Sequence, residues 1–580
     1  MSRFGGLAGG LRLPANKDRS SGVPIRTPPL PPELILPLRD GALLVAVGDV
    51  ALKGQVIAAT GRDGLPLHAP TSGHISAVAM RPLHGAPAGE GRCAVLIPDG
   101  RERWIGRTPA AAPETRSTAE LLAAVRDAGL VGLGGGGFST AVKLAPPHPI
   151  DTLVVNGMEC EPCITADDRL MREDAPAIVA GIRLAVRLLG GPPQTLIGIE
   201  DDKPEAIAAM RAALTDADTT AGIELVVLPS SYPAGSERQL IESLTGRQVP
   251  SGGVPADIGV ICFNVGTLHA LQRALACAEP LLSRVVTVTG GACRQPANYR
   301  VLLGTPMAHL LALSGYEPET GTRLLVGGPM MGMPLLDPQA PVTKTTLGIV
   351  AASAKELAPA RDPQPCIRCG LCADVCPASL LPQQLLRHAV AGNHRELERH
   401  HLFDCIECGA CAHVCPSAIP LVDHYRAAKI VVRERRDERD RADRARRRFE
   451  AHQARALHRE EEYARRREAL ALTTERPSPS PSPSPSPAPV SAAADLVREA
   501  QLRASTTAPR RAQLERALIA AQDRVAQLES QFAALDDGVA DVQRKSLHAR
   551  VQQARLDADL AHRRLAALPT QAPAADWGPQ

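Results

Sequence analysis

Eight cysteines of this chain fall into two runs with the same spacing. In each run the pattern is C-x2-C-x2-C-x3-C, and a proline follows the last cysteine. Thiolates are soft, anionic donors, and one tight loop that presents three of them suits an iron–sulfur cube. The repeat therefore predicts two [4Fe–4S] clusters. The runs consist of Cys366, Cys369, Cys372 and Cys376, and then of Cys405, Cys408, Cys411 and Cys415.

The spacing also predicts how the eight ligands divide, because in bacterial ferredoxins the fourth cysteine of each run reaches across to the other cluster. Zinc ribbons and structural thiols are the alternatives. Zinc sites usually pair two distant C-x2-C knuckles and need neither the third cysteine nor the proline. Two clusters that share ligands in this way indicate an electron relay. The predicted sets are Cys366, Cys369, Cys372 and Cys415 for one cluster, and Cys405, Cys408, Cys411 and Cys376 for the other.

A glycine-rich loop upstream of the cysteines could bind a phosphate. It reads Leu130-Val-Gly-Leu-Gly-Gly-Gly-Gly-Phe-Ser-Thr140. The exposed backbone amides of consecutive glycines can cradle an anion, and Lys143 could add a positive charge. Taken alone, a flexible turn is an equally good interpretation of the glycines.

Three further motifs follow the loop in order: Asn156-Gly-Met-Glu-Cys-Glu-Pro162, Tyr232-Pro-Ala-Gly-Ser-Glu237 and Phe263-Asn-Val-Gly-Thr267. With the glycine loop, this series resembles the FMN- and NADH-binding subunit of respiratory complex I. When the cysteine runs and a β-rich N-terminal region are added, residues 1–430 resemble the C subunit of the Rnf complex, the ion-translocating ferredoxin:NAD oxidoreductase.

The resemblance implies specific cofactors and site residues. It implies FMN and NAD(H) in addition to two [4Fe–4S] clusters. Glu159 and Glu161 become the catalytic positions near the dinucleotide, where a carboxylate can accept hydrogen bonds from ribose hydroxyls. The residues implied around FMN are Gly132, Gly134, Gly135, Lys143, Asn156, Gly235, Glu237 and Asn264.

The resemblance also implies a role and a location. The expected role is that of an enzyme of the translocase and oxidoreductase class, a peripheral subunit that passes electrons between NAD(H), via FMN, and ferredoxin-type carriers. Its expected partners are a ferredoxin-like subunit, ferredoxin, and integral membrane subunits that couple the transfer to Na⁺ or H⁺ movement. The expected location is the cytoplasmic face of the bacterial inner membrane, where those partners hold the chain.

Several positions depart from the complex I pattern, which leaves a second function open. Leu133, Met158 and Ser236 stand where the relative has an arginine, an aspartate and a glutamate, and Ser139 replaces a proline. The alternative is therefore a non-catalytic iron–sulfur wiring or scaffold subunit that has lost its flavin.

Other reactive residues have plainer interpretations. Cys160 and Cys163 form a third C-x2-C with no second knuckle nearby, so ordinary packing is favoured over redox or metal chemistry. His68 and His74 flank a predicted turn and are expected to be surface polar residues rather than ligands.

The elements that must position these residues indicate a multidomain α/β and β protein with a bacterial-type dicluster ferredoxin domain and a helical C-terminal extension. Residues 115–275 alternate helical and strand patterns, and the neighbouring modules have short strands joined by glycines. The expected domains are a barrel-sandwich-hybrid-like β module (1–114), the α/β FMN/NADH-binding domain (115–275), a β-grasp soluble-ligand-binding domain (276–355), the ferredoxin-type domain (356–425), a charged helix (426–476), a Pro/Ser linker (477–490) and a helical or coiled-coil tail (491–580).

Composition excludes some function classes. The 580 residues carry a net charge of only +3 and 2% aromatics, so neither a global field nor stacking platforms favour nucleic acid. Residues 426–470 hold 16 Lys/Arg among 10 Asp/Glu, which favours a solvated helix over a nucleic-acid binder. No apolar stretch reaches the roughly 18 residues of a membrane span, and no secretory signal is recognisable. A cytoplasmic protein is expected.

The tail beyond the linker carries a heptad pattern. Apolar residues recur at spacings of four and three, which predicts a helical hairpin or coiled coil with a partner not yet identified. The pattern consists of Leu514, Leu518, Ala521, Val525, Leu528, Phe532 and Leu535.

Overall fold

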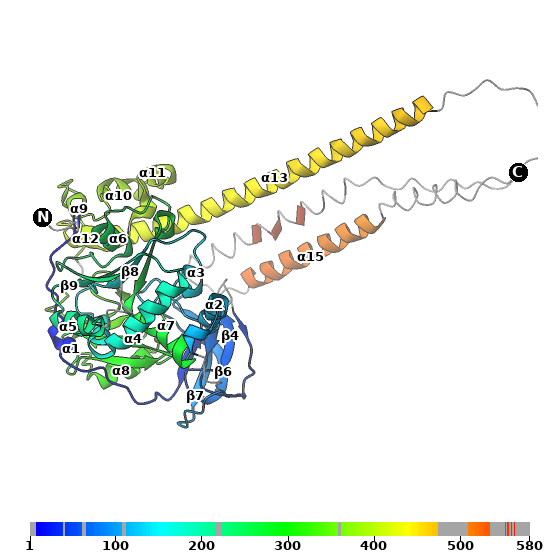
Figure 1. Cartoon of the computed structure of the whole chain (residues 1–580). Helices are drawn as coiled ribbons and strands as arrows, with labels where there is room; N and C mark the ends of the chain where they lie inside the picture. The colour runs from blue at the N-terminus through cyan, green and yellow to red at the C-terminus, as the bar shows by residue number, and fades with distance from the viewer. Residues whose placement is uncertain are drawn as a thin grey trace, which may run out of the picture. The chain divides into compact units, whose positions relative to one another are not determined.

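The computed structural model describes most of the chain, and the described residues belong to two compact units, Met1–Ala454 and Arg455–Gln580 (Figure 1). Among the described helices, none is both long enough and apolar enough to cross a bilayer. The described residues are 7–38, 41–60, 65–86, 88–106, 112–215, 222–357, 361–473, 508–533 and some positions between 551 and 566.

The first β module consists of two antiparallel sheets that enclose an aliphatic core. One sheet has the order β1-β7-β6-β3 and the other has the order β2-β4-β5. Leu34, Leu36, Ile57 and Leu96 are buried between them. The strands are β1 (Leu34–Pro37), β2 (Ala42–Leu43), β3 (Val50–Ala51), β4 (Val56–Thr60), β5 (Leu65–His68), β6 (Gly73–Pro82) and β7 (Glu90–Pro98).

One expectation about this module is wrong. His68 was expected at the surface, but it is buried, whereas His74 on the other side of the turn is exposed. The backbone of Asp127 contacts the His68 ring, and burial lowers its pKa to about 4, with the positive charge of Lys344 adding to the shift. The turn pattern could not show that the α/β domain covers this side of the module.

The α/β domain has a parallel sheet in the order β10-β9-β8-β11, with helices on both faces. Helices α4 and α7 pack together over one face, and their backbones approach so closely that a Cβ at Gly181 would lie 2.0 Å from the carbonyl oxygen of Leu268. Helix α6 covers the other face with Leu240 and Leu244. The strands are β8 (Thr152–Gly157), β9 (Gln194–Glu200), β10 (Ile223–Leu228) and β11 (Val260–Asn264). The helices are α2 (Thr118–Asp127), α3 (Thr140–Lys143), α4 (Ala166–Leu188), α5 (Pro204–Ala213), α6 (Glu237–Thr245) and α7 (Val265–Cys277).

Helix α4 begins earlier than the sequence suggests. Proline favours the first turn of a helix, so Pro176 by itself would mark a start there. Instead, a helical stretch already begins at Ala166, and the chain bends at Asp174, whose φ of −123° and ψ of 26° are not helical. Pro176 then opens the second stretch. The added N-terminal part carries Asp167 and Asp168 to the site.

The next module is a mixed five-stranded sheet in the order β13-β12-β16-β14-β15. Strands β12 and β16 are parallel, and the other pairs are antiparallel. Helix α8 (Met307–Leu313) contributes Met307 and Leu310 to its core. The strands are β12 (Ser283–Thr289), β13 (Ala297–Leu302), β14 (Gly321–Val326), β15 (Met333–Pro334) and β16 (Gly348–Ser353).

The two cysteine runs fold as two similar halves. Gly370 and Gly409 directly precede the short helices α9 and α12 and have φ angles of +87° and +79°, which other residues rarely adopt. Leu385 and Leu397 are buried in the core that the two halves share. The helices are α9 (Leu371–Asp374), α10 (Pro382–Val390), α11 (His394–Arg399), α12 (Ala410–His413) and α13 (Leu421–Thr473).

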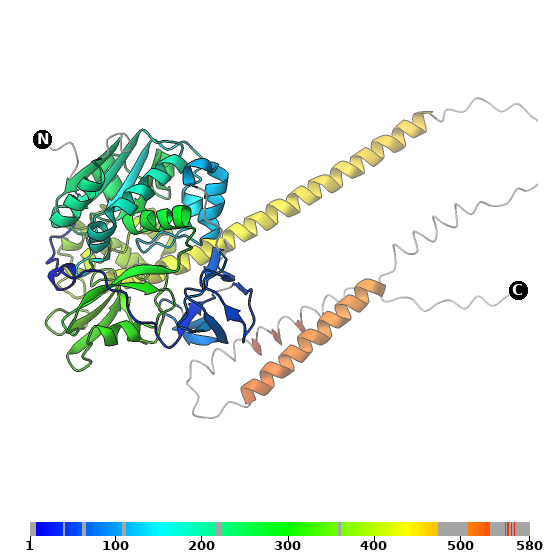
Figure 2. The same ribbon diagram turned by 60° about the horizontal axis from the view of Figure 1, so that its bottom comes forward.

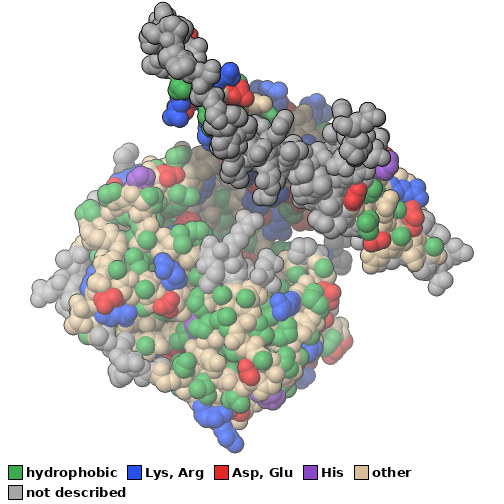
Figure 3. All heavy atoms as spheres, turned by 90° about the vertical axis from the view of Figure 1, so that its right-hand side faces the viewer, with side chains coloured by type: hydrophobic (Ala, Val, Ile, Leu, Met, Phe, Trp, Pro, Cys, Tyr) green, Lys and Arg blue, Asp and Glu red, His purple; other side chains and the backbone are tan. Residues whose placement is uncertain are grey.

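An extended N-terminal segment crosses the surface of the first unit (Figure 2). It includes the short helix α1 (Asp18–Ser21) and bonds successively to distant parts of the chain. Gly10 donates to the carbonyl of Val375 (3.0 Å), Leu11 pairs with Tyr232, and Ala15 accepts from the amide of Cys163 (2.8 Å). On the face drawn in Figure 3, charged side chains of both signs are interspersed with apolar and neutral ones over the described residues.

The second unit contains helix α15 (Ala508–Ala533). Leu528 is buried against Val551 and Ala554, which lie in a further helical stretch, and Arg555 forms an ion pair with Glu529 (2.6 Å). Two helical stretches therefore pack together in the described part of this unit, and the hairpin or coiled coil itself stays a prediction. Leu535 and the Pro/Ser linker lie outside the described residues, as do the side chains of Leu514 and Phe532.

Candidate functional site

The carboxyl ends of strands β8 and β11 form the centre of the site. These strands are neighbours, and Asn156 and Asn264 face each other in register at their ends. From β8 the sheet continues through β9 to β10 on one side and directly to β11 on the other. The strand order therefore reverses between β8 and β11, and such a switch point is where open parallel sheets bind ligands.

The glycine-rich loop lies over this point. Gly134, Gly135 and Gly136 are exposed, and their amides make no hydrogen bond to another described group. The loop is fixed on both sides, because Leu133 donates to the Thr267 hydroxyl (2.9 Å) and Gly132 donates to the Phe138 carbonyl (2.8 Å). A cradle of free, fixed amides fits a phosphate group.

Two constraints explain why glycine occurs in this loop. Gly135 has a φ of +103°, which a residue with a Cβ rarely adopts. A Cβ at Gly134 would lie 3.2 Å from the Cβ of Asn264, so glycine allows the loop to approach the end of β11. A Cβ at Gly136 would meet no atom of the described residues within 4 Å, so this face of the loop is open.

The remaining predicted cofactor residues surround the same point. Lys143 forms an ion pair with Glu237 at the start of α6, and its ammonium lies 5.4 Å from the ring centre of Phe263. Asn156 donates to the carbonyl of Gly235 (2.7 Å). The structure thus brings together the eight residues that the resemblance implied, although the two asparagines already use side-chain atoms within the protein.

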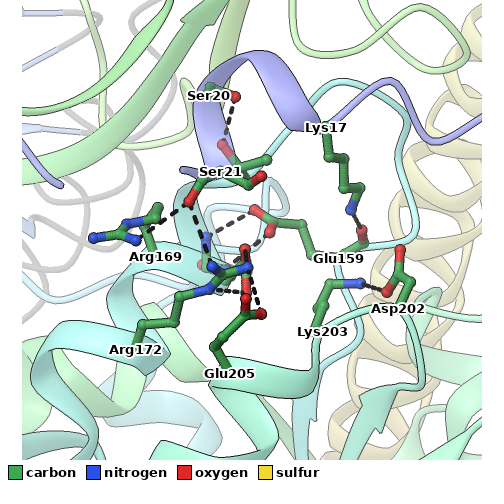
Figure 4. A network of polar contacts seen from close by, with 12 residues as sticks. Lys17, Ser20, Ser21, Glu159, Arg169, Arg172, Asp202, Lys203 and Glu205 are labelled. Atoms are coloured by element: carbon green, nitrogen blue, oxygen red, sulfur yellow. Dashed lines mark hydrogen bonds and ion pairs between the residues drawn. The ribbon is translucent and has the colours of Figure 1, made fainter. Parts of the chain in front are cut away.

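Glu159 lies at the start of α4 and caps that helix (Figure 4). Its carboxylate accepts hydrogen bonds from the amides of Asp167 (2.7 Å) and Asp168 (2.9 Å), while Lys17 donates to its backbone carbonyl. Burial raises the pKa of Glu159 to about 7, against the attraction of Lys17. In the structure, this predicted catalytic residue anchors a helix beside the site.

Glu161 lies between the α/β domain and the loop that joins β14 and β15. One carboxylate oxygen accepts from the amides of Met330 (2.7 Å) and Met331 (3.1 Å). Burial raises the pKa of this carboxyl group, and the two amides oppose the rise. Glu161 therefore ties the two modules together at the edge of the site.

Cys160 and Cys163 are packed thiols, in agreement with the plainer interpretation. The Cys160 sulfur accepts from the amide of Gly235 (3.3 Å), and burial raises the pKa of its thiol to about 12. Cys163 is buried against the β14–β16 module, and burial raises the pKa of its thiol to about 11. Neither thiol carries the depressed pKa of a reactive cysteine.

The eight clustered cysteines line two separate cavities. The amide of Leu380 approaches the Cys376 sulfur (3.4 Å), and the Cys372 sulfur lies 3.5 Å from the side-chain oxygen of Gln383. Four thiols around one cavity are the donor set that suits a [4Fe–4S] cluster. One cavity is lined by Cys366, Cys369, Cys372 and Cys415, and the other by Cys376, Cys405, Cys408 and Cys411. This grouping is the one that the spacing predicts, and ligation itself stays a prediction.

The two cavities differ in exposure. Cys366 and Cys369 are exposed, whereas Cys408 and Cys411 are buried. We call the cavity that Cys366 lines the outer cavity and the cavity that Cys408 lines the inner cavity.

The inner cavity adjoins the α/β domain through Tyr232. This residue belongs to the motif beside the glycine loop, it is buried, and its hydroxyl donates to the backbone carbonyl of Cys408. Arg238, at the start of α6, adds an ion pair with Asp404 (3.2 Å). The order in space is therefore switch point, inner cavity and outer cavity.

Sequence reasoning missed two residues at this site. Lys17 comes from the N-terminal segment, and no local pattern connects it with Glu159, which lies 142 positions away. Arg284 is buried and donates to the carbonyl of Leu133 (3.0 Å), which supports the glycine loop from behind. An isolated basic residue in an apolar strand was the only available signal.

Comparison with known proteins assigns four segments to families. Residues 125–273 match the Nuo51 FMN-binding domain, and residues 365–419 match the 4Fe-4S dicluster domain. Residues 6–101 match the RnfC barrel sandwich hybrid domain, and residues 285–334 match the SLBB domain. The fold class expected from the sequence, α/β and β modules with a dicluster ferredoxin domain and a helical C-terminal stretch, is confirmed.

Curated relatives cover most of the chain. The C subunit of the ion-translocating oxidoreductase complex of Pseudomonas aeruginosa is 49% identical over 80% of this chain and 60% of its own length. The equivalent protein of Serratia proteamaculans is 46% identical over 73% and 61%, and that of Yersinia pestis bv. Antiqua (strain Antiqua) is 45% identical over 77% and 72%. The match thus spans about three fifths of the first two relatives.

Two crystal structures of NAD⁺-reducing [NiFe]-hydrogenase are more distant. The air-oxidized state has a TM-score of 0.39 and 22% identity over 50% of this chain and 55% of that chain. The H2-reduced state has a TM-score of 0.40 and 24% identity over 55% and 64%. Likeness at this level carries no argument about function.

Proposed function

The chain belongs to the C-subunit family of the ion-translocating oxidoreductase complex, and we propose that it is the peripheral electron-transfer subunit of such a complex. In this role it passes electrons between NAD(H), via FMN, and ferredoxin-type carriers. The two [4Fe–4S] clusters are held by the eight cysteines in the sets described above.

One observation supports this proposal more than any other. The motif that borders the switch point also contacts the inner cavity, because Tyr232 donates to the carbonyl of Cys408. A flavin site and a cluster site that were unrelated would need no common motif. Electron transfer requires the centres to be close, and the order from switch point to outer cavity suits a path toward a carrier that docks at the exposed end.

The glycine loop and the strand ends would hold FMN. When bound, FMN supplies the exchange between two-electron hydride chemistry and one-electron transfer. The free amides of Gly134, Gly135 and Gly136 would bind its phosphate, and Lys143 would neutralise the negative charge. Gly235, Glu237 and the two asparagines border the same space, and Arg284 keeps the loop in place.

Glu159 and Glu161 would act beside the dinucleotide. Each carboxylate oxygen can accept two hydrogen bonds, so both residues keep acceptor capacity for ribose hydroxyls after binding the backbone amides. Lys17 fixes the loop that carries Glu159, and Glu161 fixes the distance to the β14–β15 loop. We propose that these two glutamates position the dinucleotide and give the site its negative charge.

The cysteines would set the path of the electrons beyond the flavin site. A [4Fe–4S] cluster supplies reversible one-electron transfer. Cys408 and Cys411 of the inner set are buried, and this set adjoins the α/β domain, which would limit the access of water to the first transfer. The outer set includes the exposed Cys366 and Cys369, where ferredoxin or a ferredoxin-like partner can approach.

Further parts of the proposal concern the complex. Integral membrane subunits would couple the transfer to Na⁺ or H⁺ translocation and would hold this chain at the cytoplasmic face of the inner membrane. The proposal includes no nucleic-acid partner, because acidic residues are interspersed among the basic ones along α13.

Flavin and iron analysis tests the proposal. The chain is purified anaerobically, FMN and iron are quantified, and visible absorbance is recorded before and after addition of NADH. Bleaching of a flavin band together with the iron–sulfur absorbance is expected. A preparation with full iron–sulfur absorbance, no extractable FMN and no response to NADH or added FMN would refute the enzymatic role.

A specific observation keeps the wiring alternative in view. Met158 is fully buried where the complex I relative has an aspartate, and the side chains of Asn156 and Asn264 are already bonded to Gly235 and Asp167. A wiring subunit would accept electrons from a partner protein instead of NADH. The same purification distinguishes the two, because a protein with this role holds iron but neither binds FMN nor reacts with NADH.

A further inference from the structure

Two histidines and a glutamate converge on the segment that joins the cysteine runs. His388 lies near the end of α10, while Glu396 and His400 lie on α11 and at its C-terminal cap. One ligand atom from each of the three lies within 4.8 Å of the others. All three are half-buried, and the imidazole rings of His388 and His400 are stacked with their centres 5.2 Å apart.

The local fold imposes this convergence. Glu396 and His400 are four residues apart, which places them on the same face of α11. Gly392, with a φ of +64°, and Asn393, which caps α11, turn the chain back between the two helices. The buried Leu385 and Leu397 belong to the core beneath. The three side chains are thus held by helices and by a packed core.

We propose that His388, Glu396 and His400 form a binding site for a divalent transition-metal ion of the zinc class, separate from the cysteine cavities. Two imidazole nitrogens and one carboxylate are a donor set that zinc takes in proteins, with the fourth position open to water. Oxygen-preferring ions such as Mg²⁺ and Ca²⁺ do not favour two imidazoles. The set contains no thiol, so it does not compete with the cysteines for iron.

Binding requires only a small adjustment. Metal–ligand bonds of about 2.1 Å place the ligand atoms of a tetrahedral site about 3.4 Å apart. Because the three ligand atoms lie within 4.8 Å of one another, side-chain rotations must close the set by at most about 1.4 Å. Arg399 now contacts the Glu396 carboxylate (3.1 Å), but Arg399 is 69% exposed and can turn into solvent. An exposed ion pair of this kind contributes little, so its loss opposes binding only weakly.

The location gives the site its consequence. The ion would join the end of α10 to the end of α11, and this pair of helices connects the first cysteine run to the second. Zn²⁺ has no redox chemistry of its own, so it would not act in the relay. It would cross-link the two helices and so keep the two cluster-binding halves at a fixed distance and orientation.

Zinc binding to the iron-loaded full-length chain tests the proposal. The protein is kept anaerobic with its iron content verified, because empty cysteine sets would bind zinc themselves. Equilibrium dialysis against Zn²⁺ with elemental analysis of both compartments is expected to show one saturable site per chain. His388→Gln and His400→Gln are each expected to weaken this binding about tenfold or more.

His452→Gln provides the matched control, because His452 is an exposed histidine on the described part of α13 and belongs to no ligand set. This variant should bind zinc like the wild type. Glu396→Gln, which keeps size and polarity, guards against misfolding in the histidine variants. It should keep its iron and lose zinc affinity. The proposal would be overturned if the iron-loaded wild type bound no zinc. It would also be overturned if zinc affinity were unchanged in the iron-loaded His388→Gln, Glu396→Gln and His400→Gln variants.

Discussion

The hydroxyl of Tyr232 donates a hydrogen bond to the backbone carbonyl of Cys408. Tyr232 belongs to the α/β domain, and Cys408 lies in the second cysteine run, 176 positions later in the chain. The bond therefore joins the border of the proposed flavin site to the inner set of cluster ligands. It also places the inner set, and not the outer set, next to the proposed flavin site.

Tyr232→Phe should weaken this junction. The variant leaves the Cys408 carbonyl without its partner, so the free energy of unfolding should fall by about 1 kcal/mol. Iron and FMN contents should be unchanged, but NADH-dependent reduction of the iron–sulfur centres should be several-fold slower, as measured by stopped-flow absorbance. Tyr425→Phe is the control, since Tyr425 donates to the Pro382 carbonyl (2.7 Å) within the ferredoxin domain. Equal slowing in both variants would show that the junction has no special role.

The order of the two cysteine sets can be tested by removing one ligand from each. Cys415→Ala should lose the outer cluster, about half of the iron, and retain NADH-dependent reduction of the remaining centre. Cys376→Ala should also lose about half of the iron, but NADH should no longer reduce what remains. Low-temperature EPR after addition of NADH measures this difference. The proposed order is wrong if the Cys376 variant responds to NADH and the Cys415 variant does not.

Lys143→Gln should reduce FMN content without unfolding the protein. The side chain of its partner Glu237 is 42% exposed, so water can solvate this carboxylate when the ion pair is lost. The phosphate of FMN, in contrast, would lose its cation. Lys53→Gln is closely matched, because Lys53 also pairs with a half-exposed glutamate, Glu102, and also lies over an aromatic ring. Flavin fluorescence after denaturation measures the FMN content of both variants. Full flavin in the Lys143 variant would remove this residue from the site.

His68 should make the N-terminal module sensitive to acid. Its pKa is about 4 in the folded chain and near 6.5 when unfolded, because burial disfavours the charged ring. As the pH falls from 6.5 to 4, the unfolded state takes up the proton first, so stability is lost in this window, up to about 3 kcal/mol. The difference between the unfolding temperatures at pH 7 and pH 5 should therefore be smaller in His68→Gln than in the wild type. His74→Gln, at the exposed histidine across the turn, should behave like the wild type; identical pH dependence in all three proteins would contradict the shift.

Deletion of residues 477–580 should leave NADH oxidation by the isolated chain intact, because the site and both cysteine sets lie before residue 454. Assembly with the partner proteins should be weakened instead, which co-purification measures. Loss of iron or of NADH oxidation in the truncated chain would assign the tail a role in the fold of the first unit.

Local spacing was sufficient for much of this protein. Within each cysteine run the ligands lie three or four residues apart, so the geometry of a tight loop constrains them, and the structure groups the cysteines as the spacing predicts. The glycine loop and Asn156 were also recognisable as motifs.

Contacts between distant segments were decided only by the tertiary structure. Glu159 was expected beside the dinucleotide, and only the early start of α4 revealed that its carboxylate also caps a helix. Lys17 bonds to the carbonyl of Glu159 and Tyr232 bonds to that of Cys408, and each bond joins segments more than a hundred residues apart. The burial of His68 likewise depends on residues distant in the sequence. Periodicity and spacing describe a residue's surroundings only within a few turns or strands. Which motif faces which cluster depends on how the modules pack, and that is a property of the folded chain alone.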